Sequence, residues 1–127
     1  MRMFVALAIF EGIPSGWLDS TVTLRATLDA AVAAGRFTSL QTIVVPFSPQ
    51  GVTACAVVSE SHLTLHSWPE EGRLFLDVAS CSTLESVRAA VDAVRGALPP
   101  GAKLQTLDER VIDPAGATAP AIALPEV

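Results

Sequence analysis

The residues best suited to chemistry lie between Ser59 and Glu70, in the segment Ser-Glu-Ser-His-Leu-Thr-Leu-His-Ser-Trp-Pro-Glu. This segment combines hydroxyls, two imidazoles and two carboxylates, although charged residues make up only 17% of the chain. Histidine exchanges protons near neutral pH, and a serine hydroxyl becomes a nucleophile when a base is close. Apolar runs on both sides indicate that the segment packs against the core. The alternative is a polar turn whose serines and histidines are merely solvated.

The composition predicts one domain with a substantial core. The chain has 127 residues, half of them hydrophobic, which excludes disorder for most of its length. Its formal charge of −5 argues against a nucleic-acid partner, which requires a basic surface. The apolar run at residues 1–10 ends too early, at Glu11, for a signal peptide or membrane span. We therefore expect a cytoplasmic protein, without a membrane partner, whose Cys55 and Cys81 are reduced thiols.

Hydrophobic periodicity predicts the order strand, helix, several strands, helix, strand. Helices are expected from Asp19 or Ser20 to Gly35, and behind a capping box at Ser82–Glu85. The expected strands cover residues 3–10, 40–45, 52–58, 63–68, 74–79 and 103–111. With hairpin turns between the middle strands, this order predicts an α+β two-layer sandwich, a mainly antiparallel sheet with two helices on one face. Residues 1–112 would form this single domain, and 113–127 a flexible tail.

Three spaced blocks of sequence carry a resemblance to a known family. They are Phe47-Ser-Pro-Gln-Gly-Val-Thr53, the segment Ser59–Glu70, and Leu76-Asp-Val-Ala-Ser-Cys81. In these blocks the chain resembles the small prokaryotic class of S-adenosylmethionine decarboxylases, which cut their own backbone to make a covalent pyruvoyl group. The resemblance implies a self-processing carboxy-lyase that supplies aminopropyl groups for spermidine biosynthesis. It implies the same α+β architecture.

The resemblance places the cleavage at the Glu60–Ser61 bond, which would give fragments 1–60 and 61–127. The Ser61 hydroxyl would attack the carbonyl of Glu60, and loss of the Ser61 α-proton would expel the Glu60 carboxylate. The residue left at position 61 then hydrolyses to the pyruvoyl group. Its carbonyl would bind the substrate amine as a Schiff base and serve as the electron sink for decarboxylation.

Three further roles follow from the resemblance. His66 would be the base that removes the α-proton during processing, and Cys81 would return a proton after carbon dioxide leaves. Thr53 would help to hold the processing intermediate, at a position where the family usually has serine. No metal is expected, because His62 and His66 lack a third ligand. Outside the resemblance, His62 is a solvent-facing strand residue, and Cys81 alone would be interpreted as an inert thiol.

Ser61 and His66 present a geometric conflict if they share one regular strand. Their separation is odd, so their side chains would face opposite sides of the sheet, and five strand residues span roughly 16 Å. The resemblance implies the family's solution, a homodimer with shared active sites. Ser61 and Cys81 would come from one protomer, and Thr53 and His66 from its partner.

Substrate recognition is assigned by the same resemblance. Phe47 matches the aromatic residue that stacks on adenine, and Glu70 matches the acid that binds the ribose. Phe10 is similar to a second stacking phenylalanine of eukaryotic relatives, the alternative being a core residue at a strand end. Departures from the family pattern at the N-terminus and at Ala54-Cys55 leave two other functions open. One is decarboxylation of arginine or ornithine on the same fold, and the other is a binding protein that neither cleaves itself nor turns over substrate.

Overall fold

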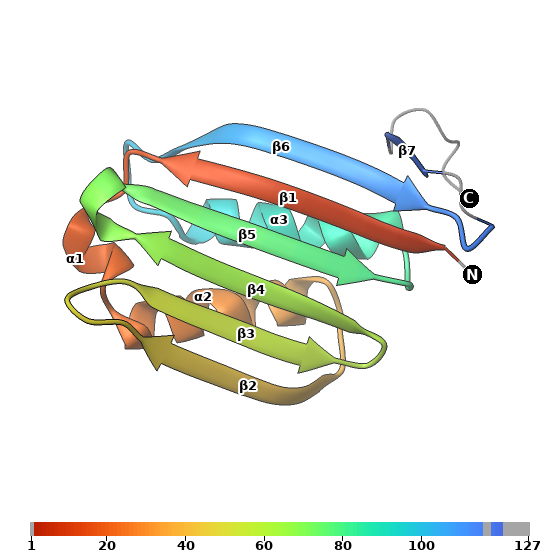
Figure 1. The fold of residues 1–127 in the computed structure, drawn as a ribbon, viewed down its shortest axis with the longest axis horizontal. Helices are drawn as coiled ribbons and strands as arrows, with labels where there is room; N and C mark the ends of the chain where they lie inside the picture. Colours follow the sequence, from red (N-terminus) through yellow and green to blue (C-terminus); the bar gives the residue numbers. More distant parts are fainter. Residues whose placement is uncertain (1, 116–117, 121–127) are drawn as a thin grey trace.

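The structure, a computed structural model, describes residues 2–115 and 118–120. In this part of the chain seven strands form one sheet in the order β2-β3-β4-β5-β1-β6-β7, and all neighbours run antiparallel (Figure 1). The strands are β1 (Met3–Glu11), β2 (Ser39–Pro46), β3 (Val52–Val58), β4 (Ser61–Trp68), β5 (Arg73–Ser80), β6 (Lys103–Ile112) and β7 (Thr118–Pro120). Strands β2 to β5 are neighbours in both sequence and space, whereas the first strand, β1, lies between β5 and β6.

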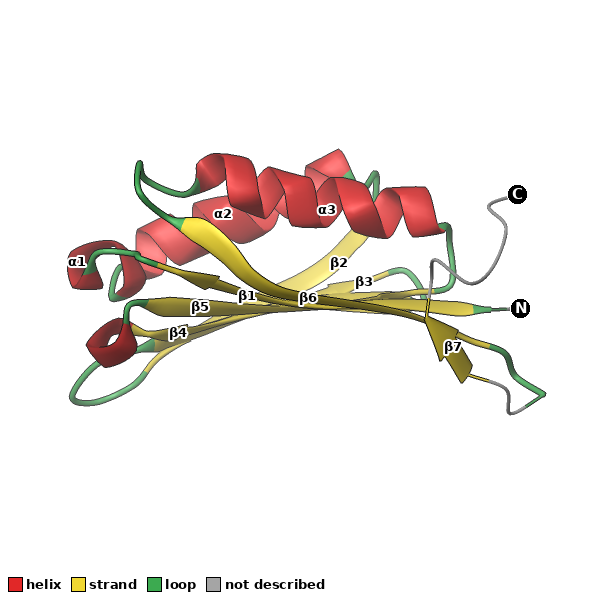
Figure 2. Ribbon diagram, turned by 90° about the horizontal axis from the view of Figure 1, so that it is seen from above, coloured by secondary structure: helices red, strands yellow, loops and turns green. Residues whose placement is uncertain are grey.

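Two long helices, α2 (Thr21–Ala34) and α3 (Leu84–Ala97), lie side by side across one face of the sheet (Figure 2). The short helix α1 (Ser15–Leu18) and the 3-10 turn η1 (Pro69–Glu71) lie together at one end of the sheet (Figure 1). Ser20 caps α2, as the sequence predicts, because its hydroxyl accepts a hydrogen bond from a backbone N–H of the first turn at 3.1 Å. The two long helices are those that the periodicity predicts, whereas the short α1 lies between the first expected strand and the first expected helix.

The cap of α3 differs from the predicted one. Thr83 is the N-cap, and its hydroxyl accepts the backbone N–H of Ser86 at 3.0 Å. The prediction of a capping box formed by Ser82 and Glu85 is therefore wrong by one residue at its start. The Ser82 hydroxyl instead lies 2.8 Å from the hydroxyl of Ser80, at the end of β5.

The two faces of the sheet have different environments because side chains alternate along each strand. On β3, Val52, Ala54, Ala56 and Val58 face the helices and are buried, whereas Thr53, Cys55 and Val57 point the other way and are partly exposed. Strands β4 and β5 continue the pattern, with Leu63, Leu65, Leu74, Leu76 and Val78 fully buried in the core. No described helix covers the opposite face, which we call the open face (Figure 2).

The predicted fold class is confirmed: the chain is an α+β sandwich with an antiparallel sheet and its long helices on one side. Strand β4 begins at Ser61 rather than at residue 63, which places the predicted cleavage site directly at a strand end. The tail predicted for 113–127 falls partly outside the described residues, and within it Thr118–Pro120 pair with β6. Among the described helices, none is long and apolar enough to cross a bilayer.

Candidate active site

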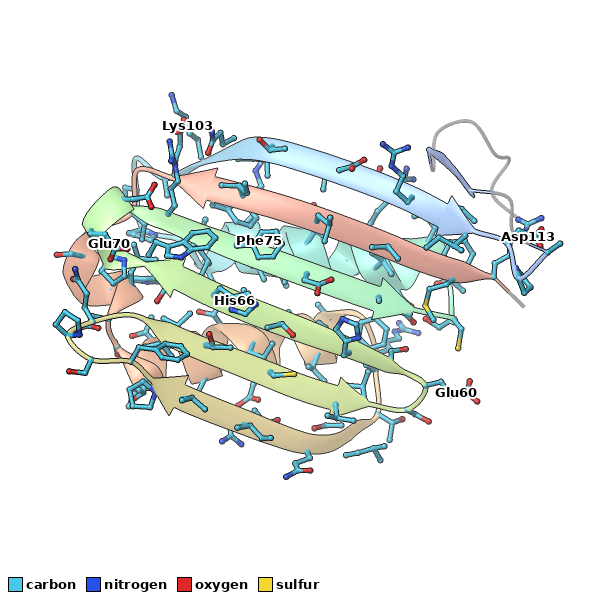
Figure 3. All side chains as sticks on the ribbon, in the orientation of Figure 1. Glu60, His66, Glu70, Phe75, Lys103 and Asp113 are labelled. Carbon is cyan, nitrogen blue, oxygen red and sulfur yellow. The ribbon has the colours of Figure 1, made fainter. Side chains whose placement is uncertain are left out.

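The predicted cleavage site lies in the tight turn between β3 and β4. Val58 pairs with Ser61, so Ser59 and Glu60 alone form the turn, and Glu60 is labelled at its tip in Figure 3. Glu60 has a φ of 60°, in the left-handed region that glycine favours. For a residue with a side chain this conformation costs roughly 1–2 kcal/mol. The bond predicted to break therefore follows a strained residue.

Ser61 is the first residue of β4 and is partly exposed. Its hydroxyl donates a hydrogen bond to the carbonyl oxygen of Ser59 at 3.3 Å. The carbonyl group that the hydroxyl would attack in the predicted cleavage is the next one along the chain, that of Glu60. A rotation about the Cα–Cβ bond of Ser61, between staggered positions, would redirect the hydroxyl.

Cys81 lies beside this turn, immediately after β5 ends. Its thiol donates to a carboxylate oxygen of Glu60 at 3.2 Å, and its sulfur is 3.6 Å from the Glu60 carbonyl oxygen. The hydrogen bond to Glu60 is the largest cause that raises the pKa of the Cys81 thiol, followed by desolvation and by the negative charge of Glu60. The fold thus brings together three of the predicted site residues, Glu60, Ser61 and Cys81, which we call the cleavage cluster.

A second group of predicted residues lies further along β4, on the open face. Thr53 and His66 are directly opposite each other on β3 and β4, and Thr53 Oγ1 is 2.9 Å from His66 Nδ1. The His66 ring stacks on Phe75 of β5, with ring centroids 5.8 Å apart and planes at 20°. Phe75 in turn stacks on Trp68 at 6.2 Å. Figure 3 shows His66 and Phe75 adjacent on neighbouring strands, and we call these four residues the histidine cluster.

The contacts of His66 suit it to act as a base. Two neighbours fix the ring: the Thr53 hydroxyl at its edge and the Phe75 ring on its face. When Nδ1 donates its hydrogen to the Thr53 oxygen, Nε2 carries the free lone pair and can accept a proton from another group. An imidazole held in one orientation by a hydroxyl is the arrangement that general-base catalysis requires.

The two predicted substrate residues lie near the histidine cluster and away from the cleavage cluster. Phe47 follows β2 on the β2–β3 loop and is 53% exposed, and Glu70 is exposed in η1, directly after β4. Figure 3 shows Glu70 and Glu60 at opposite ends of the sheet. The loop of Phe47 is fixed at Gly51, whose N–H donates to the Asp19 carboxylate at 2.9 Å, and whose carbonyl accepts the Phe47 N–H at 2.8 Å.

Comparison with known proteins identifies the family. A model of the S-adenosylmethionine decarboxylase family matches residues 6–109. The chain belongs to this family. Its members are carboxy-lyases, and the family resemblance seen in the three sequence blocks is thereby confirmed.

Individual members of the S-adenosylmethionine decarboxylase family match over most of their length. The S-adenosylmethionine decarboxylase proenzyme of Prochlorococcus marinus is 35% identical over 109 residues, which cover 86% of each chain. That of Thermoplasma volcanium is 31% identical over 94 residues, 74% of this chain and 72% of the relative. The crystal structure of adenosylmethionine decarboxylase from Aquifex aeolicus superimposes with a TM-score of 0.73 and 26% identity, covering 86% of this chain and 87% of that one.

Within this S-adenosylmethionine decarboxylase fold, Phe10 lies away from the open face. It is fully buried on the helix side of β1, together with Ala6 and Ala8. An adenine ring cannot stack on a side chain that has no exposed surface. The burial of Phe10 therefore favours the alternative that it is a core residue at a strand end.

Two features of the open face could not be predicted from residue types alone. His62, expected to face solvent, is 46% exposed but lies 3.3 Å from the Asp77 carboxylate on β5. Phe75 stacks on the ring of His66, a contact that depends on the register of β4 and β5. Strand alternation does predict that Phe75 and Asp77 point away from the core, and this signal could have found them. In the described residues no group of three His, Cys, Asp or Glu side chains could hold a metal ion.

Proposed function

We propose that this chain is a self-processing, pyruvoyl-dependent decarboxylase of S-adenosylmethionine whose product supplies aminopropyl groups for spermidine biosynthesis. Its membership of the S-adenosylmethionine decarboxylase family and the proenzyme names of its relatives support the proposal. The single observation that carries it is the cleavage cluster: a Glu60–Ser61 bond after a strained residue, with the Cys81 thiol at the same carbonyl.

Self-cleavage requires only groups that the chain itself supplies, plus one water molecule. The Ser61 oxygen forms a bond to the carbonyl carbon of Glu60, the amide C–N bond breaks, and the Ser61 nitrogen becomes a free amine. A base then takes the Ser61 α-proton, and the Cβ–Oγ bond of Ser61 breaks, so that the Ser61 oxygen leaves with Glu60 as part of its new terminal carboxylate. Water replaces the nitrogen as ammonia leaves, and residue 61 becomes the pyruvoyl group. His66, held by Thr53, is the base that this proposal assigns.

The surroundings of Ser61 fit a pyruvoyl group. Ser61 begins a strand, so after cleavage the new terminus remains anchored by the pairing of β4 with β3 and β5. The cleavage cluster supplies a proton donor, Cys81, next to that terminus. The pyruvoyl group supplies the electron-withdrawing carbonyl on which loss of carbon dioxide depends. In the proposal Cys81 then gives a proton to the substrate carbon, while Phe47 and Glu70 bind the adenine and the ribose.

We also infer that the active enzyme is a homodimer with shared sites. Ser61 aligns with the buried Val58 and Ser80, and His66 aligns with Thr53 and Phe75 on the open face. The two clusters are thus five residues apart on one strand, roughly 16 Å, and point to opposite faces. Because Ser61 lies at the very end of β4, a twofold axis that packs two open faces together would bring that end of one protomer beside the histidine cluster of its partner. Ser61 would then have to turn from the helix side toward the open face for its α-carbon to meet the partner's His66.

The open face has the apolar surface that such packing would bury. Its exposed hydrophobic side chains include Ile43, Val45, Val57 and Trp68, each at least 39% exposed. These residues lie on neighbouring strands β2, β3 and β4, so they form a continuous area. Contiguous exposed apolar surface of this kind is typical of protein interfaces. This surface supports the dimer independently of the separation of the two clusters.

The proposal is tested by following self-cleavage and carbon dioxide release in the same preparation. The purified chain should give fragments 1–60 and 61–127, with the second resistant to N-terminal sequencing, while Ser61→Ala stays intact. Labelled carbon dioxide should be released from S-adenosylmethionine and not from arginine or ornithine supplied in parallel. A chain that stays whole, or one that acts on a free amino acid alone, would contradict the proposal.

A further inference from the structure

The Glu60 side chain makes a contact that self-cleavage does not require. Cleavage uses the carbonyl carbon of Glu60, whereas the carboxylate lies 3.2 Å from the Cys81 thiol. Glycine or asparagine is usual at a turn position with positive φ, because longer side chains are strained there. A glutamate with a φ of 60° at such a position requires an explanation based on its side chain.

We propose that Glu60 is a positioning residue for Cys81: its carboxylate accepts the thiol hydrogen and holds Cys81 in the protonated form. It continues to do so after cleavage, as the C-terminal residue of the N-terminal fragment. This inference deepens the proposed function and rests on it, since the protonated thiol matters as the donor that acts after decarboxylation. It assigns to Glu60 a role that outlasts the cleavage of its own peptide bond.

The chemistry of proton donation explains why this contact is useful. A donor must carry its proton when the carbon is ready to receive it, and a thiol that has ionised cannot serve. An anion in hydrogen-bond contact disfavours the thiolate, because two negative charges would then be adjacent. The pKa of Cys81 is raised, with the hydrogen bond to Glu60 as the first cause. Glu60 is the ionisable side chain that bonds this thiol in the described structure.

Cleavage itself would strengthen the arrangement. The carbonyl oxygen of Glu60, 3.6 Å from the Cys81 sulfur, becomes part of a terminal carboxylate when the bond to Ser61 breaks. The thiol then lies between two carboxylates of one residue. Both favour the protonated thiol, so the cleaved enzyme should hold the Cys81 proton to a higher pH than the uncleaved chain does.

The first test measures the thiol without requiring enzymatic activity. In an uncleaved Ser61→Ala chain, alkylation of Cys81 by iodoacetamide is followed against pH by peptide mass spectrometry, with Cys55 as internal reference. Glu60→Gln keeps an acceptor oxygen and removes the charge. It should shift the Cys81 profile to lower pH by roughly half a unit to one unit, whereas Glu71→Gln at the other end of the sheet should not. Identical Cys81 profiles for Glu60→Gln and Glu71→Gln would overturn the proposal.

A second variant protects the test against misfolding. Glu60→Asn tolerates positive φ and shortens the side chain, so it should shift the Cys81 profile in the same direction. An unchanged alkylation rate at the half-buried Cys55 shows in each sample that the sheet is intact. A shift that appears together with a faster reaction at Cys55 reports unfolding and counts against the proposal.

The second test uses the cleaved enzyme. Turnover of S-adenosylmethionine, divided by the amount of cleaved chain, should fall on the alkaline side of its pH profile. This fall should begin at a lower pH in Glu60→Gln than in the unaltered protein. A fall that begins at the same pH in both would overturn the role after cleavage. Failure of the proposed function has a different signature: absence of carbon dioxide release by the unaltered protein, with the Cys81 alkylation profile still dependent on Glu60.

Discussion

The two ends of β4 differ in how firmly they hold their reactive groups. At its start, Ser61 follows a strained two-residue turn, and the contacts of the cleavage cluster are exposed. Near its other end, His66 lies within regular pairing, fixed by Thr53 and stacked on Phe75. The difference matches the two tasks that the proposed function assigns to these ends. A bond that must break benefits from a backbone that can change conformation, whereas a base must keep one orientation.

The largest expected effect is the return of activity when two inactive variants, one altered at each end of β4, form a hybrid dimer. A His66→Ala chain and a Cys81→Ala chain should each be inactive alone. Mixed before cleavage, they should form hybrid dimers in which one site combines the intact cleavage cluster of the first with the intact histidine cluster of the second. Cleavage of the His66→Ala chain and carbon dioxide release should therefore return in the mixture. If light scattering shows that the active protein is a monomer, the prediction of active sites shared between protomers is wrong.

A smaller loss of cleavage rate is expected when the His66 ring loses the hydroxyl group that orients it. Thr53→Val keeps the shape of the side chain and removes the hydroxyl that lies 2.9 Å from Nδ1. Cleavage should slow by about 10- to 100-fold, by analogy with the loss of groups that orient metal-binding histidines. Gel densitometry over time measures the rate, and Thr53→Ser, which keeps the hydroxyl, should stay near the original value. Equal rates for Val and Ser would show that the hydroxyl has no role in cleavage.

Two adjacent glutamates, Glu70 and Glu71, offer a matched test of substrate binding at the end of β4 that carries the histidine cluster. Glu70→Gln keeps an acceptor oxygen for a ribose hydroxyl but removes its charge, and hydrogen bonds to charged groups are stronger than neutral ones by about 1–1.5 kcal/mol. The KM for S-adenosylmethionine should rise by about 5- to 15-fold with cleavage unaffected. Glu71→Gln removes only an exposed ion pair with Arg73, at 3.1 Å, and should have little effect. The same KM for both variants would argue against ribose binding at Glu70.

The smallest effects should come from the loop of Phe47. Phe47→Ala should reduce turnover about two- to tenfold, the value of an aromatic stack, without slowing cleavage. Asp19→Ala frees the N–H of Gly51 and so loosens the same loop, for a loss of about fivefold or less. Because both changes act through one loop, their combined effect should be smaller than the product of the two. Independent effects in the double variant would show that Asp19 does not act through Phe47.

Much of this arrangement could be predicted from the sequence, because hydrophobic alternation determines which face of a strand is buried. The pattern of β3 placed Thr53 opposite the core, and the odd separation of Ser61 and His66 predicted their opposite directions. The family resemblance was needed to select these residues from other polar side chains. Spacing along the chain could not show that Thr53 and His66 touch, since that contact depends on the register of β3 with β4.

The remaining differences have local physical causes. The turn at Ser59–Glu60 contains neither glycine nor asparagine, so nothing in its composition predicted the positive φ or the early start of β4. Helix α1 has four residues, too few to show a helical period. Phe10 lies near a strand end, two residues before Gly12, as a ligand-binding residue could, but its place on the helix side of β1 buries it.

The position of β1 between β5 and β6 has a consequence for the two fragments that the proposed cleavage would produce. A break after Glu60 assigns β1, β2 and β3 to one fragment and β4 to β7 to the other. The two pieces are therefore interleaved: β1 is held on both sides by strands of its partner piece, and β3 pairs with β4. Separation would require three rows of backbone hydrogen bonds to open together. In the proposed cleavage, folding would therefore precede the cut. Unfolded halves would have to find this arrangement again as separate molecules, which would make unfolding much harder to reverse.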